Sequence, residues 1–450
     1  MARDILLVMS DQHNGIYTSL TRGMEDITPN IRRIGEEGGS VFGRAYCNSP
    51  LCVPSRMSFL RGELPSETMI FENDMTLNSD RPTLAHEIGL EGYETILVGR
   101  MHFMAFDQFH GFDKRLVGDI TNRWWGMTRD ELGDFHRGFG SSGCQEMVGC
   151  GETAITDFDR TVFNEALRLI GEPSDRPRFI VVGFYQPHYP YVSLSDEIDV
   201  ASSVDEEGVA MEPLRGYASC RRETTVERAK KINIVYKRMV HTIDRYVGGL
   251  YDAFRKTSDG LFVYTSDHGD QLGKRSIYGK RTLYEDSIRI PLVISGADVD
   301  RTDGPIDLLA LHDLLLRYAR GQECAVEERP VVVQSLIEGP EGEVLAEAVL
   351  DGRLKLVRLG DEMHLYDVVS DPEETIDIQT DNQVDVSRLV DGLLDDDRRA
   401  NCLKHVRSHR KEAKVLRNFG RSRHMNYFTN FEVGDSFVPA PSYVYESEGE

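Results

Sequence analysis

Long apolar segments are missing from this sequence. No window of 18 residues is predominantly apolar, so we expect no membrane-spanning helix. The segment Met1-Ala2-Arg3-Asp4 leads directly into a short apolar run and lacks the longer apolar core of a signal peptide. The 7 cysteines are odd in number and show no paired spacing, which argues against a disulfide framework. Together these absences predict a cytoplasmic protein in a reducing compartment.

Basic residues are also in short supply. The chain has 52 Lys and Arg against 75 Asp and Glu, a formal charge of -23. This balance disfavours nucleic acid and anionic membranes as partners, because both attract basic surfaces. An anionic small molecule can still bind where a local basic pocket lies inside the acidic surface. With 40% apolar residues and 17 prolines in 450 residues, the chain is expected to be globular, with one large domain and a smaller one.

Short apolar runs alternate with helical patterns through residue 320. This order predicts an α/β domain over 1–320, with a large, mainly parallel sheet flanked by helices. A long, turn-rich insertion over about 104–176, which includes Trp124 and Trp125, is expected to shape specificity. The predicted buried strands are 4–9, 93–98, 178–184 and 261–265, and the predicted helices are 28–38, 82–90 and 224–256.

The pattern changes after residue 320. Shorter strands over 344–366, with a turn at Asp351-Gly352, predict a smaller C-terminal antiparallel α+β subdomain over 321–400. The tail, 401–450, continues a basic run that spans 398–423 and then carries Tyr427, Phe428 and Phe431. A run of this kind is usually a solvated helix face. The alternative is a subunit contact, and on that basis we expect a homo-oligomer.

Polar side chains follow two strands that lie far apart in the sequence. Asp11 and Gln12 end the first strand, and Asp267 and His268 end the strand at 261–265. Because ligands of open α/β sheets bind at the carboxyl ends of the strands, we expect these residues to meet. Oxygen donors with one imidazole predict a divalent metal, with Ca²⁺ preferred over Mg²⁺ or Mn²⁺.

Cys52 stands in the string Pro50-Leu51-Cys52-Val53-Pro54-Ser55-Arg56, at a predicted strand-to-helix junction. A single cysteine is most often buried and inert, while a nearby cation is typical of an activated nucleophile. The residues alone leave both interpretations open.

The string Cys52-x-Pro54-Ser55-Arg56, followed by Leu60-Arg61-Gly62, resembles the signature of the type I sulfatases of the alkaline phosphatase superfamily. The resemblance implies an alkaline phosphatase-like fold and a maturing enzyme that oxidises Cys52 to formylglycine. It also implies that the hydrated aldehyde attacks a sulfate ester, with Arg56 holding the hydrate and Asp267 as its base. The implied metal ligands are Asp11, Gln12, Cys52, Asp267 and His268.

Further segments are similar to the choline sulfatase and phosphonate monoester hydrolase branch. They are Phe71-Glu72-Asn73, Gly99-Arg100-Met101-His102, Pro187-His188-Tyr189-Pro190 and Tyr278-Gly279-Lys280. The likeness implies that Asn73, Arg100, His188 and Lys280 bind the substrate. It implies that His188 or Lys280 protonates the leaving oxygen and that His102 takes the last proton. Arg100 replaces the family's lysine, keeps the charge and cannot readily release a proton.

The sequence therefore predicts a sulfatase that acts on a sulfated carbohydrate or a small sulfate such as choline sulfate. Three alternatives stay open: a phosphonate monoester or phosphodiester hydrolase, a metal-dependent phosphatase, and a non-catalytic anion-binding protein.

Overall fold

A computed structural model describes residues 3–21, 26–104, 107–119, 127–128, 147–195, 198–299, 304–326, 328–339, 342–423, 425–426 and 443–444. Trp124, Trp125, Tyr427, Phe428 and Phe431 lie outside the described residues. None of the described helices combines the length and the apolar character that a bilayer span requires.

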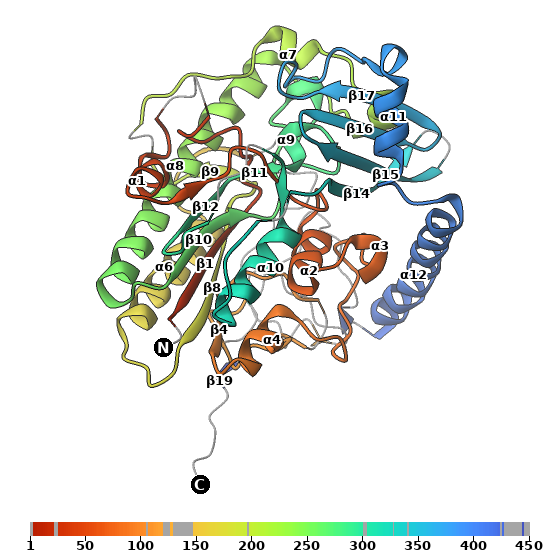
Figure 1. The fold of residues 1–450 in the computed structure, drawn as a ribbon. Helices are drawn as coiled ribbons and strands as arrows, with labels where there is room; N and C mark the ends of the chain where they lie inside the picture. The colour runs from red at the N-terminus through yellow and green to blue at the C-terminus, as the bar shows by residue number, and fades with distance from the viewer. Residues whose placement is uncertain are drawn as a thin grey trace.

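The protein is built on one large sheet with the strand order β19-β5-β4-β8-β1-β10-β12-β2 (Figure 1). Strands β5, β4, β8, β1 and β10 pair in parallel, whereas β12, β2 and β19 are antiparallel to their neighbours. The predicted α/β class with a mainly parallel sheet is confirmed. The strands are β1 (Ile5–Asp11), β2 (Ser40–Val41), β4 (Glu94–Gly99), β5 (Lys114–Leu116), β8 (Arg178–Pro187), β10 (Leu261–Ser266), β12 (Leu292–Ser295) and β19 (Tyr443–Val444).

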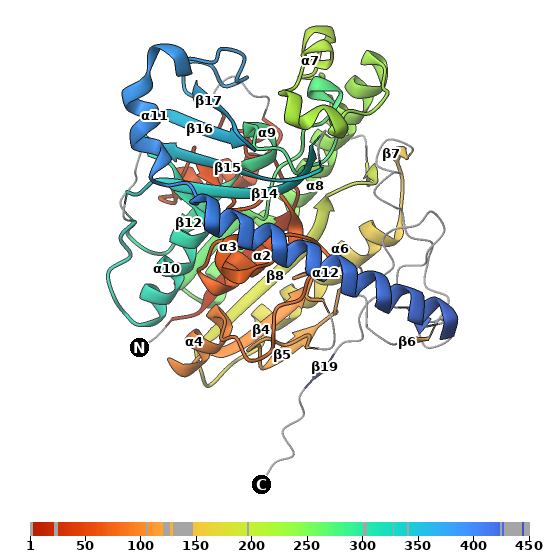
Figure 2. The same cartoon turned by 90° about the vertical axis from the view of Figure 1, so that its right-hand side faces the viewer.

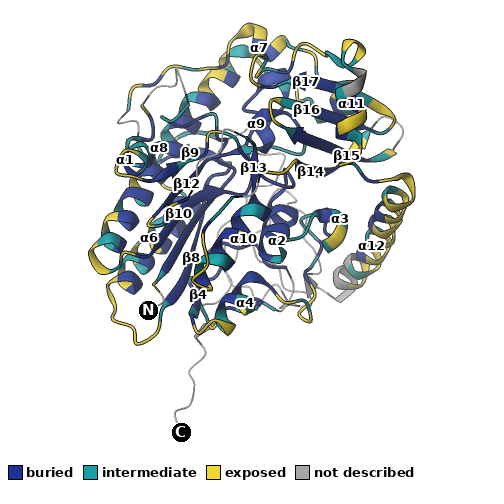
Figure 3. Ribbon diagram, in the orientation of Figure 1, coloured by how far each residue is buried: buried dark blue, intermediate teal, exposed yellow. Residues whose placement is uncertain are grey.

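Both faces of this sheet are covered, because its central strands are apolar on both sides (Figure 3). Leu6 and Val8 of β1 pack in the core beneath α1, α6 and α8, while Ile5, Leu7 and Met9 pack in the opposite core with α2, α4 and α10. Side chains alternate between the faces of a strand, so one continuous run serves two cores. The helices are α1 (Pro29–Glu36), α2 (Cys52–Arg61), α4 (Leu84–Leu90), α6 (Ala154–Gly171), α8 (Val226–Thr257) and α10 (Leu308–Ala319).

The prediction of a turn-rich insertion over 104–176 is wrong in two places, one near its start and one in its last part. Residues Ala154–Gly171 form α6, an 18-residue helix, and Lys114–Leu116 form β5 of the main sheet. The Thr153 side chain caps α6 by accepting a hydrogen bond from Thr156 N–H. The helical spacing of Ile155, Phe158, Val162 and Ala166 was present in the sequence, and all four are buried.

The C-terminal antiparallel sheet is confirmed, with the order β14-β15-β16-β17. Its strands are β14 (Val331–Gly339), β15 (Gly342–Asp351), β16 (Leu354–Leu359) and β17 (Glu362–Asp367). The predicted turn at Asp351-Gly352 joins β15 to β16, and β14 was not predicted. Residues of β14 and β15 share a hydrophobic core with β1 and α2. The domain boundaries at 320 and 400 stay predictions.

The basic run forms α12 (Asp396–Arg423), which follows the small α11 (Gln383–Val390) and lies beside α3 (Pro65–Thr68) (Figures 1 and 2). The described parts of the tail pair within the same chain: β18 (Met425–Asn426) with β6 (Met127–Thr128), and β19 with β5. The remaining short elements are β3 (Ala45–Tyr46), β7 (Val148–Cys150), β9 (Tyr191–Ser193), α7 (Glu206–Ala210), α9 (Glu285–Ile288), β11 (Arg289–Ile290) and β13 (Ile306–Asp307).

Candidate active site

Cys52 is the first residue of α2 and is buried. Leu51 before it is extended, so the chain turns from strand-like backbone into helix at this residue. The Asn73 Oδ1 atom accepts a hydrogen bond from Val53 N–H at 3.0 Å, which satisfies one free donor of the first turn. The sulfur therefore lies at the positive end of a helix, where an anion is stabilised.

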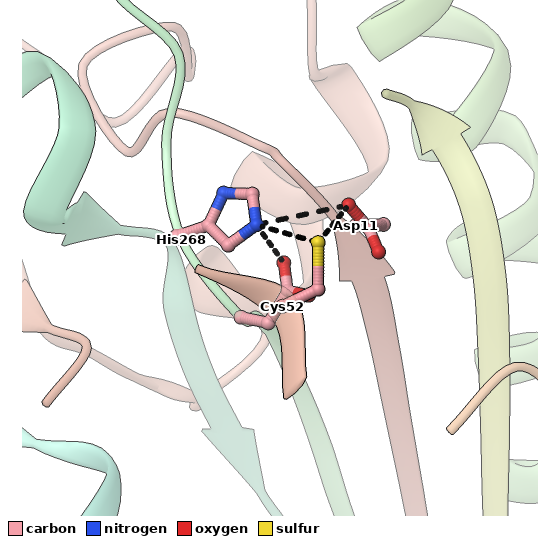
Figure 4. Close-up of side chains that lie close together, drawn as sticks. Asp11, Cys52 and His268 are labelled. Atoms are coloured by element: carbon pink, nitrogen blue, oxygen red, sulfur yellow. Dashed lines mark hydrogen bonds and ion pairs between the residues drawn. The ribbon is translucent and has the colours of Figure 1, made fainter. Parts of the chain in front are cut away.

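Four donor groups surround this position: Asp11, Cys52, Asp267 and His268. Their ligand atoms all lie within 4.8 Å of one another, and all four residues are buried. The Cys52 sulfur is 3.2 Å from His268 Nε2 and 3.7 Å from Asp11 Oδ1 (Figure 4). Asp11 and Asp267 meet because β1 and β10 are parallel neighbours in register, as the sequence predicted.

The donor set fits a hard divalent cation. Two carboxylates and one imidazole are the ligand types that such ions take, and burial excludes competing water. His268 Nδ1 lies 3.0 Å from the Gly269 carbonyl oxygen and so donates to it. Its Nε2 lone pair therefore faces the two carboxylates, which is the orientation a metal ligand needs. Asp11, Asp267 and His268 are the residues that would hold the ion.

Gln12 lies next to this group, but its side chain has other partners. Its Oε1 accepts from Lys280 Nζ, and its Nε2 donates to Asp270. Its backbone N–H donates to Asp267 Oδ1 at 3.0 Å. The role of Gln12 as a metal ligand stays a prediction.

Two buried arginines neutralise the carboxylates. Arg56 Nε donates to Asp267 Oδ2 at 2.8 Å, and its Nη2 is 3.3 Å from Asp11 Oδ2. Arg100 Nε donates to the same Asp11 oxygen at 2.6 Å. Burial by itself raises the pKa of Asp11, but Arg100 and then His188 and Arg56 outweigh it and hold that pKa well below its usual range. Burial prevails at Asp267, whose pKa is raised despite Arg56.

Arg100 is held entirely among protein groups and is only 1% exposed. Besides Asp11, it contacts Asp119 at 3.4 Å and His102 Nδ1 at 3.0 Å, and its guanidinium carbon lies 4.5 Å from the Tyr185 ring centroid. Through these contacts the Arg100 guanidinium orients the side chains of Asp11 and His102. Its predicted role in substrate binding stays a prediction, as does that of Asn73.

Positive and hydrogen-bonding groups converge on residue 52. Burial raises the pKa of the Cys52 thiol, but Lys280 and His268, together with the hydrogen bonds between Cys52 and the side chains of His102 and His188, bring it well below its ordinary value. Burial and Arg100 lower the pKa of His102. Burial and Lys280 lower that of His188 to about 4. The position is therefore prepared for negative charge, and it gathers the predicted residues Cys52, His102, His188, His268 and Lys280.

Sequence reasoning missed the carboxylates behind these residues. Asp119 accepts from the backbone of His102, Asp159 from that of Tyr185 and Gln186, and Asp270 holds Gln12, Tyr191 and Gly279 N–H. Asp270 lies three residues after Asp267, in the same polar segment that follows the strand at 261–265, so its position was a signal in the sequence. Nothing in the sequence distinguished Asp119 or Asp159 from other aspartates.

The fold and the site together define an α/β protein with a metal-type ligand cluster beside a cysteine that begins a helix. Residues 3–314 match the family model described as Sulfatase. The chain belongs to the sulfatase family.

Similar proteins include the choline-sulfatase of Rhizobium meliloti (strain 1021), which is 32% identical over 333 residues. That match covers 66% of this chain and 63% of the relative, so the chain spans less than two thirds of the relative's length. A solved structure from Bacteroides thetaiotaomicron VPI-5482, assigned to the sulfatases, has a TM-score of 0.67 at 16% identity and covers 99% of both chains. The phosphonate monoester hydrolase of Agrobacterium radiobacter has a TM-score of 0.61 at 19% identity, covering 94% of this chain and 96% of its own.

Proposed function

We propose that the protein is a sulfatase that hydrolyses an organic sulfate monoester to an alcohol and inorganic sulfate. The observation that carries the proposal is the position of Cys52, within its Cys-x-Pro-Ser-Arg string, against the buried Asp11, Asp267 and His268. We propose that a maturing enzyme converts Cys52 to formylglycine and that the metal is Ca²⁺, with Mg²⁺ or Mn²⁺ as alternatives. When present, the aldehyde hydrate supplies the nucleophilic hydroxyl and the metal neutralises charge.

Arg56 and Arg100 fix the two carboxylates, and their positive charges favour the ionised form of each. Lys280, held by Gln12, adds a cation on the same side as His188, where it would offset the charge of the sulfuryl oxygens. Fixed charges of this kind act without reorganising during the reaction, which is why they are commonly the largest catalytic contribution.

The hydrogen bonds of His188 and His102 favour different roles in proton transfer for the two side chains. His188 Nδ1 lies 2.7 Å from the Tyr189 carbonyl oxygen and must donate to it, so Nε2 of the neutral ring can accept a proton. Arg100 can only donate, so His102 Nδ1 accepts and Nε2 carries the proton. We therefore revise the predicted roles: His102 donates a hydrogen bond to the group at position 52, and His188 accepts a proton. Lys280 is then the candidate that protonates the leaving oxygen.

The substrate proposed first is a small sulfate such as choline sulfate, because the 32% identical relative bears that name. A sulfated carbohydrate is the second substrate class. Phosphonate monoester or phosphodiester hydrolysis is the alternative reaction, favoured by the pairs Asp11-Gln12 and Asp267-His268. The homo-oligomer and the cytoplasmic location stay predictions.

Mass spectrometry and turnover test the proposal. Protein made together with a maturing enzyme should show formylglycine at position 52 and release sulfate from a panel of choline sulfate, sulfated sugars and an aryl sulfate. Cys52→Ser should fold and lose multiple turnover, because a serine sulfate ester lacks the second hydroxyl that expels sulfate. Cys150→Ser, at an exposed cysteine, is the matched control and should retain activity. An unmodified thiol in fully active protein, sustained turnover by Cys52→Ser, or faster cleavage of an aryl phosphonate than of an aryl sulfate would contradict it.

A further inference from the structure

Two buried aspartates, Asp119 and Asp159, bind the backbone near the carboxyl ends of the neighbouring parallel strands β4 and β8. β4 and β8 pair along their length, and their chains continue into the segments that carry His102 and His188. Asp119 accepts hydrogen bonds from Met101 N–H at 3.2 Å and His102 N–H at 2.7 Å. Asp159, on α6, accepts from Tyr185 N–H at 2.7 Å and Gln186 N–H at 2.8 Å. Each carboxylate thus binds two consecutive backbone donors just before or at a histidine of the site.

The first of these segments needs an external restraint. His102 has a φ of 60°, which a residue with a Cβ adopts only when its surroundings impose it. Asp119 supplies that restraint through the His102 N–H and also contacts the Arg100 guanidinium at 3.4 Å. One carboxylate therefore fixes both side chains that reach the site from this segment.

The second segment is linked to the first through aromatic contacts. The Tyr185 ring lies under the Arg100 guanidinium, and its centroid is 4.9 Å from that of His188. Asp159 holds the backbone of Tyr185, so a shift of that backbone would move both the arginine and the histidine. Asp119 and Asp159 are each completely buried, so no water competes for their acceptor atoms.

We propose that Asp119 and Asp159 are positioning residues of the site: Asp119 fixes His102 and Arg100, and Asp159 fixes His188. The proposal rests on the sulfatase function proposed above. Neither aspartate touches the reacting atoms, so each acts through the side chain that it orients. Loss of either is expected to lower the rate of the reaction more than the affinity for the substrate.

The test compares Asp119→Asn, Asp119→Ala, Asp159→Asn and Asp159→Ala with two controls. Asp113→Asn removes a carboxylate that accepts from Thr95 N–H at 3.0 Å, at the opposite end of β4. Asp157→Asn changes an exposed aspartate on the same helix as Asp159. Amide hydrogen exchange of peptides covering residues 99–104 and 183–188 is measured on unmodified protein, and kcat and KM for an aryl sulfate are measured on matured protein.

We expect the Asn variants to lose about 10- to 100-fold in kcat with KM changed by less than about threefold, which is the range found when a partner that orients a metal ligand is lost and which we carry over to these orienting aspartates. The Ala variants should lose more, because Asn keeps one acceptor oxygen. Exchange should accelerate only in the peptide that the altered aspartate holds, and both controls should match the wild type. If the Asn variants keep the wild-type kcat, or if exchange rises evenly over the whole chain in proportion to lost activity, the aspartates are merely structural and the proposal is wrong. A wild-type protein inactive on every sulfate ester would instead refute the proposed function, and the local exchange pattern would still decide whether the aspartates hold these segments.

Discussion

Replacing Arg56 with methionine is expected to destabilise the metal-free protein strongly and in a pH-dependent way. Arg56 is completely buried and contacts Asp267 at 2.8 Å and Asp11 at 3.3 Å. Arg100 still neutralises Asp11 in the variant, but among the described residues Asp267 is then left with the imidazole of His268, 3.7 Å away, and with no arginine or lysine partner. Breaking a buried ion pair from one side costs about 3–5 kcal/mol, because it leaves an uncompensated charge.

The sign of the pH effect follows from the pKa of Asp267. Burial raises this pKa and Arg56 lowers it, so the variant has a higher native pKa than the wild type. A native carboxyl that binds its proton more tightly than the unfolded chain loses stability as pH rises. The difference between the two proteins should therefore be small near pH 4 and largest at pH 8.

Urea unfolding of chelator-treated protein at pH 5 and pH 8 measures this difference, with circular dichroism as the signal. The control is Arg168→Met, at an arginine 52% exposed in a surface pair with Glu165, which should change stability by less than about 1 kcal/mol. Added Ca²⁺ should narrow the gap, since a cation bound by Asp11 and Asp267 replaces part of the lost charge. An Arg56→Met variant within about 1 kcal/mol of the wild type at pH 8 would refute the argument that this arginine compensates buried charge.

Three further results are expected. Removal of divalent metal should abolish sulfate release and lower the midpoint of urea unfolding. Titration with Ca²⁺, Mg²⁺ and Mn²⁺ in turn should show which ion restores both. Full activity after exhaustive chelation would count against the metal site. Gly183→Ala should destabilise the protein by about 1–3 kcal/mol or more, because a Cβ there would lie 1.8 Å from the Arg100 carbonyl oxygen, whereas Gly171→Ala, with open space around it, should be neutral in the same urea titration. Truncation after residue 424 should reduce oligomer size in light scattering if the tail forms a subunit contact; an unchanged size would refute that contact.

Much of the fold was readable from local patterns. The strands β1, β8 and β10 are buried on both faces, so nearly every consecutive residue in them must be apolar. A run of apolar residues of this kind is visible in the sequence. The same holds for α8, whose apolar positions recur at helical spacing and whose predicted bounds agree closely with Val226–Thr257. The apolar residues of α6 also recur at helical spacing. This helix was not predicted because it lies within a segment that we interpreted as a loop.

The candidate site divides in the same way. The sequence by itself determined which residues could do chemistry, because Cys52 with its following Arg56, and the acids after β1 and β10, are combinations of residue types within a few positions. Only the tertiary structure decided how these residues are held. Arg100 binds Asp11, and His102 accepts a hydrogen bond from Arg100. Asp119 and Asp159 bind the backbone of the segments that carry His102 and His188. The physical reason is that side-chain spacing records whether a residue is buried, whereas the choice of a hydrogen-bond partner many residues away depends on which strands and helices become neighbours when the sheet assembles.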